Sequence, residues 1–169
     1  MSEIRSAPSH AEGVAGHLDR AAVLAVSEAE PAWLRDRRLA AWDRYEATPM
    51  PSTRMEEWRY TDLSKKLKLD SLRQLPWAER RFSLDRAPEG LRAAMAADPG
   101  ESGHLVDLDG SVAYVTLDDA LAAKGVVLTS LRKAVETHPD LLERLLGTEA
   151  LPAEAGKFQA LNGALWTDG

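Results

Sequence analysis

The sequence of 169 residues contains no cysteine. This absence excludes disulfides, thiolate metal sites and a cysteine nucleophile. No apolar run approaches the roughly 18 residues that indicate a membrane helix, and residues 1–16 lack the basic start and the apolar stretch of a secretory leader. We therefore expect a cytoplasmic protein that has no membrane partner.

Positive charge is also scarce. The chain carries 21 Lys and Arg against 27 Asp and Glu, which gives a formal net charge of −6 at pH 7. General binding of nucleic acid depends on clustered Lys and Arg that neutralise phosphates, so this balance argues against a nucleic-acid partner. Local basic clusters are more simply explained as solvated surfaces. They comprise Arg35, Arg37, Arg38 and Arg44, and then Lys65, Lys66 and Lys68.

Residues that carry out catalysis or bind metals are present, but they are not clustered. The four histidines have no spacing typical of metal ligands, since they stand at positions 10, 17, 104 and 138. Side chains of adjacent carboxylates, as at Glu56–Glu57 and Asp118–Asp119, diverge on a strand or on a helix, so adjacency alone does not aim two acids at one substrate. No Gly-rich nucleotide loop or nucleophile elbow is present. The sequence thus predicts a chain that is not an enzyme and holds no metal or cofactor.

Apolar residues make up 44% of the sequence, which is enough for one packed domain. Their helical spacing predicts a first helix over about residues 11–28 and a second helix that begins at Pro31 and ends near Ala47. Arg38 projects into the apolar face of the second helix. Such a charge either runs its apolar stem along Trp42 or pairs with a carboxylate, because an unpaired buried charge costs several kcal/mol.

The second half of the chain predicts a small sheet with helices against it. Runs rich in β-forming residues at 105–108 and 112–117 flank Asp109-Gly110, a dipeptide suited to a two-residue hairpin turn. A third apolar run at 125–128 predicts one more strand. The fold class is therefore α+β, with N-terminal helices followed by a hairpin, a third strand and packed helices. Apolar stripes and caps predict those helices over 89–97, after Thr129 or Ser130, from Pro139 to Gly147 and over about 155–165.

The segments along the chain differ in composition, although we expect one compact domain overall. The predicted divisions are a flexible tail over residues 1–8, a helical segment over 9–48, an irregular segment with short helices over 49–100, and a small α+β segment over 101–169.

The most informative stretch is residues 49–63, which we name the clamp segment. Two prolines end the preceding helix, and acids, bases and two large aromatics then fill seven positions. An exposed Trp is uncommon in a charged loop, so this composition predicts aromatics docked in a groove with charged side chains paired at its rim. The aromatics either pin the loop onto its own domain or anchor another protein. The candidate clamp and docking residues are Arg38, Arg54, Glu57, Trp58, Arg59 and Tyr60, with Glu57 expected to pair with Arg38.

Four sequence blocks, in order, carry a resemblance to a known family. They are Glu-Glu-Trp-Arg-Tyr-Thr-x-Leu after a Trp-rich helix and Pro-x-Pro, His104 to Gly110, Gly125 to Leu128 leading into His138-Pro139-Asp140, and Phe158 to Gly169. From about residue 31 to residue 169 the chain resembles the N-terminal region of the SufD branch of the SufB/SufD family. Members of that family are scaffold subunits of the Suf iron–sulfur cluster assembly complex.

The resemblance implies a domain that leads into a large β-helix, which is absent from this chain. It also implies SufB-like and SufC-like partners for the full-length protein, and an iron–sulfur cluster that the full complex handles. The family supplies no catalytic residue here, so the chain is expected to be a non-catalytic structural and docking domain. One alternative is an independent helical adaptor for protein partners. A weaker alternative is a nucleic-acid-binding module that uses the basic clusters.

Overall fold

The computed structural model describes residues 16–63, 65–74, 84–97, 102–108, 110–148 and 151–168. The tail expected over residues 1–8 lies outside these ranges. The helices are α1 (Arg20–Val26), α2 (Ala32–Ala47), α3 (Glu89–Ala96), α4 (Asp119–Ala122), α5 (Leu131–Thr137), α6 (Pro139–Leu145) and α7 (Lys157–Leu165). The strands are β1 (Gly16–His17), β2 (Arg73–Gln74), β3 (Gly103–Asp107) and β4 (Val112–Leu117). Short 3-10 turns span Glu56–Trp58, Leu69–Ser71, Leu84–Arg86 and Ala153–Ala155. The α+β class is confirmed.

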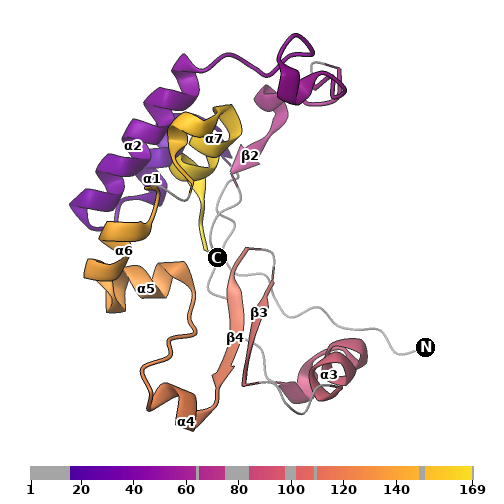
Figure 1. The fold of residues 1–169 in the computed structure, drawn as a ribbon, viewed down its shortest axis with the longest axis vertical. Helices are drawn as coiled ribbons and strands as arrows, with labels where there is room; N and C mark the ends of the chain where they lie inside the picture. The colour runs from indigo at the N-terminus through magenta and orange to yellow at the C-terminus, as the bar shows by residue number, and fades with distance from the viewer. Residues whose placement is uncertain are drawn as a thin grey trace.

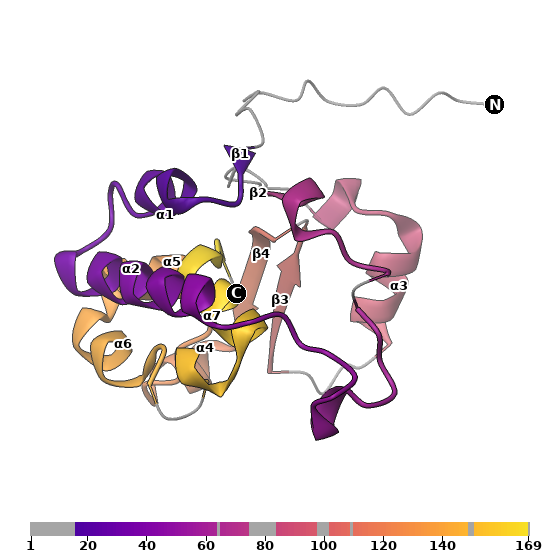
Figure 2. The ribbon, with the colours of Figure 1, turned by 90° about the horizontal axis from the view of Figure 1, so that it is seen from above.

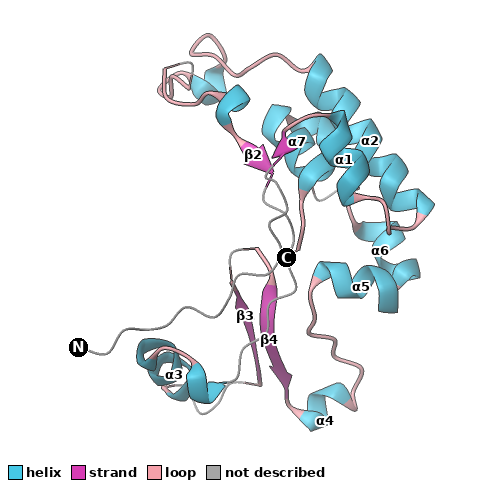
Figure 3. Ribbon diagram, turned by 180° about the vertical axis from the view of Figure 1, so that it is seen from behind, coloured by secondary structure: helices cyan, strands magenta, loops and turns pink. Residues whose placement is uncertain are grey.

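Helices α1, α2 and α7 form one group, and α5 and α6 extend it (Figure 1). The β3–β4 hairpin stands beside this group, and seen from above it lies between the helices and α3 (Figure 2). The clamp segment lies in the loop between α2 and β2, at the end of the molecule opposite α4 (Figure 3). The clamp is therefore a peripheral feature supported by the helical group.

The first helix is shorter than the sequence pattern predicts. The Asp19 side chain accepts a 2.8 Å hydrogen bond from the Ala22 backbone N–H, and α1 therefore begins at Arg20. Gly16 and His17 instead pair antiparallel with Gln74 and Arg73 as β1 and β2. The expectation of helix at Gly16–Asp19 was wrong because the cap at Asp19 fixes the start of the helix, while the residues before it are extended.

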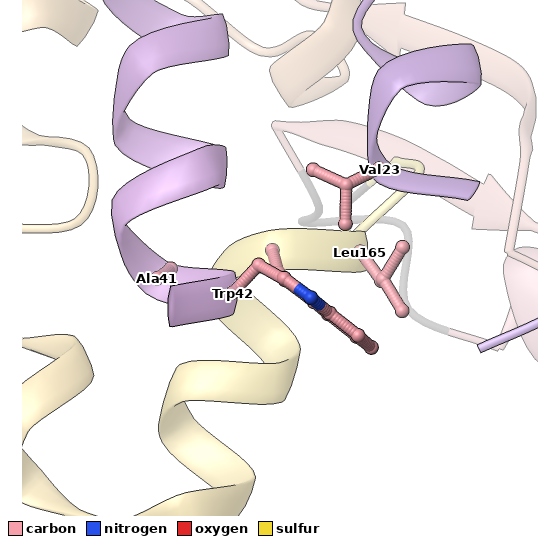
Figure 4. Packing of buried hydrophobic residues seen from close by; sticks show 5 residues of the cluster. Val23, Ala41, Trp42 and Leu165 are labelled. Carbon is pink, nitrogen blue, oxygen red and sulfur yellow. The ribbon is translucent and has the colours of Figure 1, made fainter. Parts of the chain in front are cut away.

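The second helix forms where its pattern predicts and connects two apolar clusters. Trp42 is 3% exposed and packs in the first cluster with Val23, Ala41, Ala164 and Leu165 (Figure 4). Leu34, two turns earlier on the same face, packs in the second cluster with Ala134, Val135 and Leu142. One face of α2 thus joins the N-terminal helices to the C-terminal ones.

The hairpin prediction is confirmed. Leu105 pairs with Val115 in an antiparallel ladder that carries an irregularity between Val106 and Asp107. Leu108 and Ser111 exchange backbone hydrogen bonds of 2.8 and 3.3 Å, and Gly110 takes the positive φ of 78° that the turn requires.

The third strand predicted over residues 125–128 does not form, and the hairpin has only two strands among the described residues. Gly125 instead ends α4 in a left-handed conformation, with φ 86°. Its N–H donates to the Ala122 carbonyl, and the Val126 N–H donates to the Leu121 carbonyl. This pair of bonds closes the helix end. The strand prediction failed because Gly125 caps the short helix α4, and the apolar residues 125–128 alone did not indicate that helix.

Helices α2 and α7 make the most extensive helix–helix contact, and each caps the other with a cation. The Lys157 ammonium, at the start of α7, donates 2.7 Å hydrogen bonds to the Tyr45 and Thr48 carbonyls at the end of α2. Arg38 of α2 donates to the Ala164 and Trp166 carbonyls at the end of α7, at 3.2 and 2.8 Å. Cations at the C-termini of helices satisfy free carbonyls and oppose the negative end of the helix dipole.

Arg38 pairs with a carboxylate, which is one of the two environments that its position on the apolar face of α2 allowed. It is 1% exposed, and its Nε and Nη2 donate 2.7 Å hydrogen bonds to the two carboxylate oxygens of Glu30. The guanidinium lies 4.2 Å from the centre of the Trp166 ring. Pairing with a carboxylate is thus confirmed, but Glu57 as the partner was wrong. Glu30, just before α2, reaches the buried guanidinium, whereas Glu57 is exposed in the clamp segment.

Lys157 gives the fold a dependence on pH. Burial lowers the pKa of the Lys157 ammonium below its ordinary value of 10.5, with the Glu46 carboxylate acting in the opposite direction. Between the lowered pKa and 10.5 the unfolded chain binds more protons than the folded one, so the contribution of Lys157 to stability rises with pH in that window. The difference in free energy of unfolding between the parent chain and Lys157→Met should widen as pH approaches 10.5. Urea titrations of both chains at neutral and alkaline pH measure this difference, and a difference that stays constant or narrows with pH would contradict the prediction.

Candidate docking surface

The clamp segment is a series of tight turns rather than an open loop. Backbone hydrogen bonds run from the Met55, Trp58 and Thr61 N–H groups to the carbonyls three residues earlier, at 2.9 to 3.0 Å. Pro51 is buried at its start. These local bonds fix the directions of the side chains that follow, because each turn leaves its residues little freedom in φ and ψ.

Trp58 fastens the clamp segment to the body of the domain. Its side chain is half-buried, and its ring contacts Phe158 of α7, with ring centroids 5.8 Å apart and planes at 52°. Such a tilted aromatic pair is favourable beyond its buried area. For this residue the contact is the one expected if the aromatics pin the loop onto its own domain.

Tyr60, two residues later, has a different environment. It is 91% exposed, and Met55 is 42% exposed. The Arg59 guanidinium lies 5.8 Å from the centre of the Tyr60 ring and forms an ion pair with Glu56. The clamp segment thus buries one aromatic and exposes the other.

The predicted site residues therefore separate into two places. Arg54, Glu57, Trp58, Arg59 and Tyr60 lie together in the clamp segment, whereas Arg38 lies in the interior between α2 and α7. Sequence reasoning missed Glu30 and Phe158. Glu30 stands immediately before Pro31 at the start of α2, where an acid eight residues from Arg38 was a visible alternative to Glu57.

The first basic cluster does not form a polyanion site. Besides the burial of Arg38, Arg37 donates a 2.8 Å hydrogen bond to the Leu146 carbonyl and lies 5.0 Å from the centre of the Trp33 ring. The second cluster is more open, since Lys65, Lys66 and Lys68 are all exposed. Lys65 lies 3.5 Å from Asp62. Arg35 and Arg44 of the first cluster are exposed as well, so the engaged arginines of that cluster are Arg37 and Arg38.

Outside the clamp segment, the described structure has one hollow with several polar side chains but no cluster of metal-binding type. Within the described ranges, no group of three or more His, Cys, Asp or Glu could hold a metal ion. A hollow of about 470 Å³ separates α3 from the hairpin and is lined in part by Asp85, Arg92, His104 and Tyr114. Among the residues that the structure describes, no helix is long and apolar enough to cross a membrane.

Mutations in the clamp segment should separate its structural residue from its exposed ones. Trp58→Ala removes a half-buried ring and should lower the free energy of unfolding by about 1–3 kcal/mol, less than for a fully buried aromatic. Glu57→Ala and Tyr60→Ala should each change it by about 0.5 kcal/mol or less, because both side chains face solvent. Urea titrations measure all three. A Tyr60→Ala cost equal to that of Trp58→Ala would show that Tyr60 is packed in solution.

Comparison with curated proteins relates the chain to iron–sulfur cluster assembly. It is 29% identical over 143 residues to the iron-sulfur cluster assembly protein SufD of Bacillus subtilis. It is 26% and 25% identical over 142 residues to iron-sulfur cluster assembly SufBD family proteins of Staphylococcus haemolyticus and Staphylococcus aureus. No protein-family model and no solved structure matches the chain.

The fold and the candidate site define a small α+β domain with an exposed aromatic and basic surface. The curated proteins that it matches are named SufD and SufBD family proteins, and the chain is similar to them over most of its length. Each of these matches covers 83% of this chain but only 30% or 31% of the relative. The chain therefore spans about a third of the length of the relatives that it matches.

Proposed function

We propose that the chain is a structural and docking domain of a SufD-like component of an iron–sulfur cluster assembly complex. The similarity over 83% of the chain to proteins named for iron–sulfur cluster assembly supports the proposal. In this role the domain performs no catalysis and holds no cluster, in keeping with its lack of cysteine. The cluster belongs to the full complex, whose SufB-like and SufC-like subunits are the proposed partners of the full-length protein in the cytoplasm.

The clamp segment is the proposed docking element. Its backbone is fixed by local turns and its Trp58 by Phe158, so its exposed residues are held ready for a partner. A preorganised surface loses less conformational entropy on binding than a flexible loop does. Aromatic and arginine side chains are enriched among the residues that dominate binding energy in protein interfaces. Tyr60, Arg54 and Arg59 supply these types.

The proposal is tested by size-exclusion co-elution of the chain with purified SufB-like and SufC-like subunits and with a sulfur-donor protein. We expect co-elution with at least one of them, but not with the SufC-like ATPase, whose docking region the family resemblance places C-terminal to the region matched by these 169 residues. Anaerobic reconstitution with iron and sulfide should leave the chain without visible charge-transfer bands. Failure to bind any component, or near-stoichiometric iron, would overturn the proposal.

An independent adaptor is the second candidate, because the 91% exposure of Tyr60 suits any protein partner. The same co-elution experiment separates the two candidates. An adaptor would bind none of the Suf components, and its clamp variants would lose a partner from outside that machinery.

A further inference from the structure

The clamp segment and the lysines after it form a positively charged surface on an acidic chain. Residues 54–68, which we name the clamp surface, carry five basic and three acidic side chains, a net charge of +2 against −6 for the whole chain. They project at one end of the molecule, away from the hairpin (Figure 3). A local potential opposite to that of the whole chain favours partners of negative charge.

Internal ion pairs neutralise only part of this surface. Arg59 pairs with Glu56, and Lys65 with Asp62. Arg54, Lys66 and Lys68 are exposed, and none of the three has a recorded ion pair with another described residue. Among the described residues of this surface, three cations thus remain against Glu57, the one carboxylate that forms no ion pair there. This excess is available to an external acidic group without breaking an ion pair among the described residues.

Tyr60 supplies an apolar contact in the midst of these charges. Its ring is 91% exposed although the neighbouring Trp58 is held against Phe158, and Met55 adds a 42% exposed thioether side chain. A Tyr ring combines a large apolar area with a hydroxyl at its tip, and it loses little entropy when it is covered. Tyr and Arg are among the residue types that dominate binding energy in protein interfaces, and this surface exposes Tyr60 together with Arg54.

We propose that the clamp surface docks an acidic segment of a partner protein, with Tyr60 as the apolar anchor and Arg54, Lys66 and Lys68 facing the partner's carboxylates. The inference rests on the docking role proposed above and specifies the chemistry of the partner. Glu57, between Arg54 and Tyr60 in sequence, adds selectivity, because it repels an acid at that position and accepts a cation there.

The same features disfavour nucleic acid as the partner. Three unpaired cations neutralise few phosphates, and the Glu57 carboxylate repels a continuous phosphate backbone. Arg37 and Arg38, which would have extended the basic surface along α2, are engaged inside the domain. A protein segment can alternate acids with apolar residues to match both the lysines and Tyr60, whereas a polynucleotide has a charge at every unit.

The test uses the whole chain and an array of immobilised peptides with Asp or Glu at alternate positions and apolar residues between them. An array of the same design with Lys at those positions and a single-stranded DNA oligonucleotide serve as competing probes. We expect binding to acidic peptides only, weakened by added salt.

Tyr60→Ala and the double variant Lys66→Glu/Lys68→Glu should each weaken binding about tenfold or more. The matched control Lys124→Glu, at an exposed lysine after α4, should change it by about twofold or less.

Three outcomes would overturn the inference. They are binding of the Lys array as strong as that of the acidic array, tighter binding of the oligonucleotide, and clamp variants that bind like Lys124→Glu. Applying the same variants to the co-elution experiment separates this inference from the proposed function. If a Suf component still co-elutes with Tyr60→Ala and Lys66→Glu/Lys68→Glu, the function stands and the inference fails. If acidic peptides bind at Tyr60 and no Suf component co-elutes, the inference stands and the function fails.

Discussion

Replacing Glu30 by Ala should lower the free energy of unfolding by about 3–5 kcal/mol, the cost of leaving a buried charge without its partner. Arg38 is 1% exposed, and the Glu30 carboxylate supplies two of its hydrogen bonds. Its other hydrogen bonds go to the Ala164 and Trp166 carbonyls, which carry only partial negative charge. Without Glu30 the guanidinium keeps its full charge in an interior that water does not reach.

The measurement is a double-mutant cycle by urea titration with Glu30→Ala, Arg38→Met and the double variant. We expect strong coupling, because removing the guanidinium cancels the penalty that Glu30→Ala creates. Arg38→Met remains destabilising by itself, since it also uncaps α7. Asp43→Ala is the matched control: it breaks the exposed ion pair with Arg20 and should cost about 0–1 kcal/mol. A Glu30→Ala cost no larger than that of Asp43→Ala would show that the buried pair contributes little.

Trp42→Ala should be as damaging, at about 3–5 kcal/mol, because it leaves a cavity where Val23, Ala41 and Leu165 meet. Trp42→Phe should cost only about 1 kcal/mol or less. The indole Nε1–H is buried and finds no acceptor among the described residues. A buried donor without a partner costs about 1–3 kcal/mol, so removing it offsets part of the packing that Phe loses.

Thermal and urea unfolding of Trp42→Ala and Trp42→Phe measure the two losses of stability. A Phe variant as unstable as the Ala variant would show that the indole N–H has a partner in solution. Val23→Ala, which removes two methyl groups from the same cluster without changing any polar group, calibrates the cost of a cavity at this position.

Sequence predicted best those elements that short-range chemistry determines. Helix α2 follows from Pro31 and a one-sided apolar stripe, and the hairpin follows from Asp109-Gly110 between two β-forming runs. The failures came from competing local chemistry of the same kind. The cap at Asp19 shortened α1, and Gly125 closed α4 where an apolar run had indicated a strand. Asp19 and Gly125 are both visible in the sequence. The sequence does not show, however, whether the cap or the apolar pattern determines the local structure.

The candidate site was harder to predict because its contacts join distant parts of the chain. Composition identified the clamp segment, yet it treated Trp58 and Tyr60 alike. The partner that distinguishes them is Phe158, a hundred positions further along, and no local periodicity links the two. For Arg38, burial called for a carboxylate but left several acids equally eligible. The structure shows that Arg38 donates to the Ala164 and Trp166 carbonyls at the end of α7. It also shows that the carboxylate that pairs with Arg38 is Glu30.

The mutual capping of α2 and α7 also sets when the domain can form during its synthesis. Residues 32–47 are synthesised well before the Lys157 ammonium that caps them and before the Ala164 and Trp166 carbonyls that Arg38 caps. Until then Arg38 has no carbonyls to cap, and the α2 face that carries Leu34 and Trp42 lacks most of its cover. The nascent chain therefore has an incomplete core while about a hundred more residues are added, and during that interval its exposed apolar surface favours aggregation.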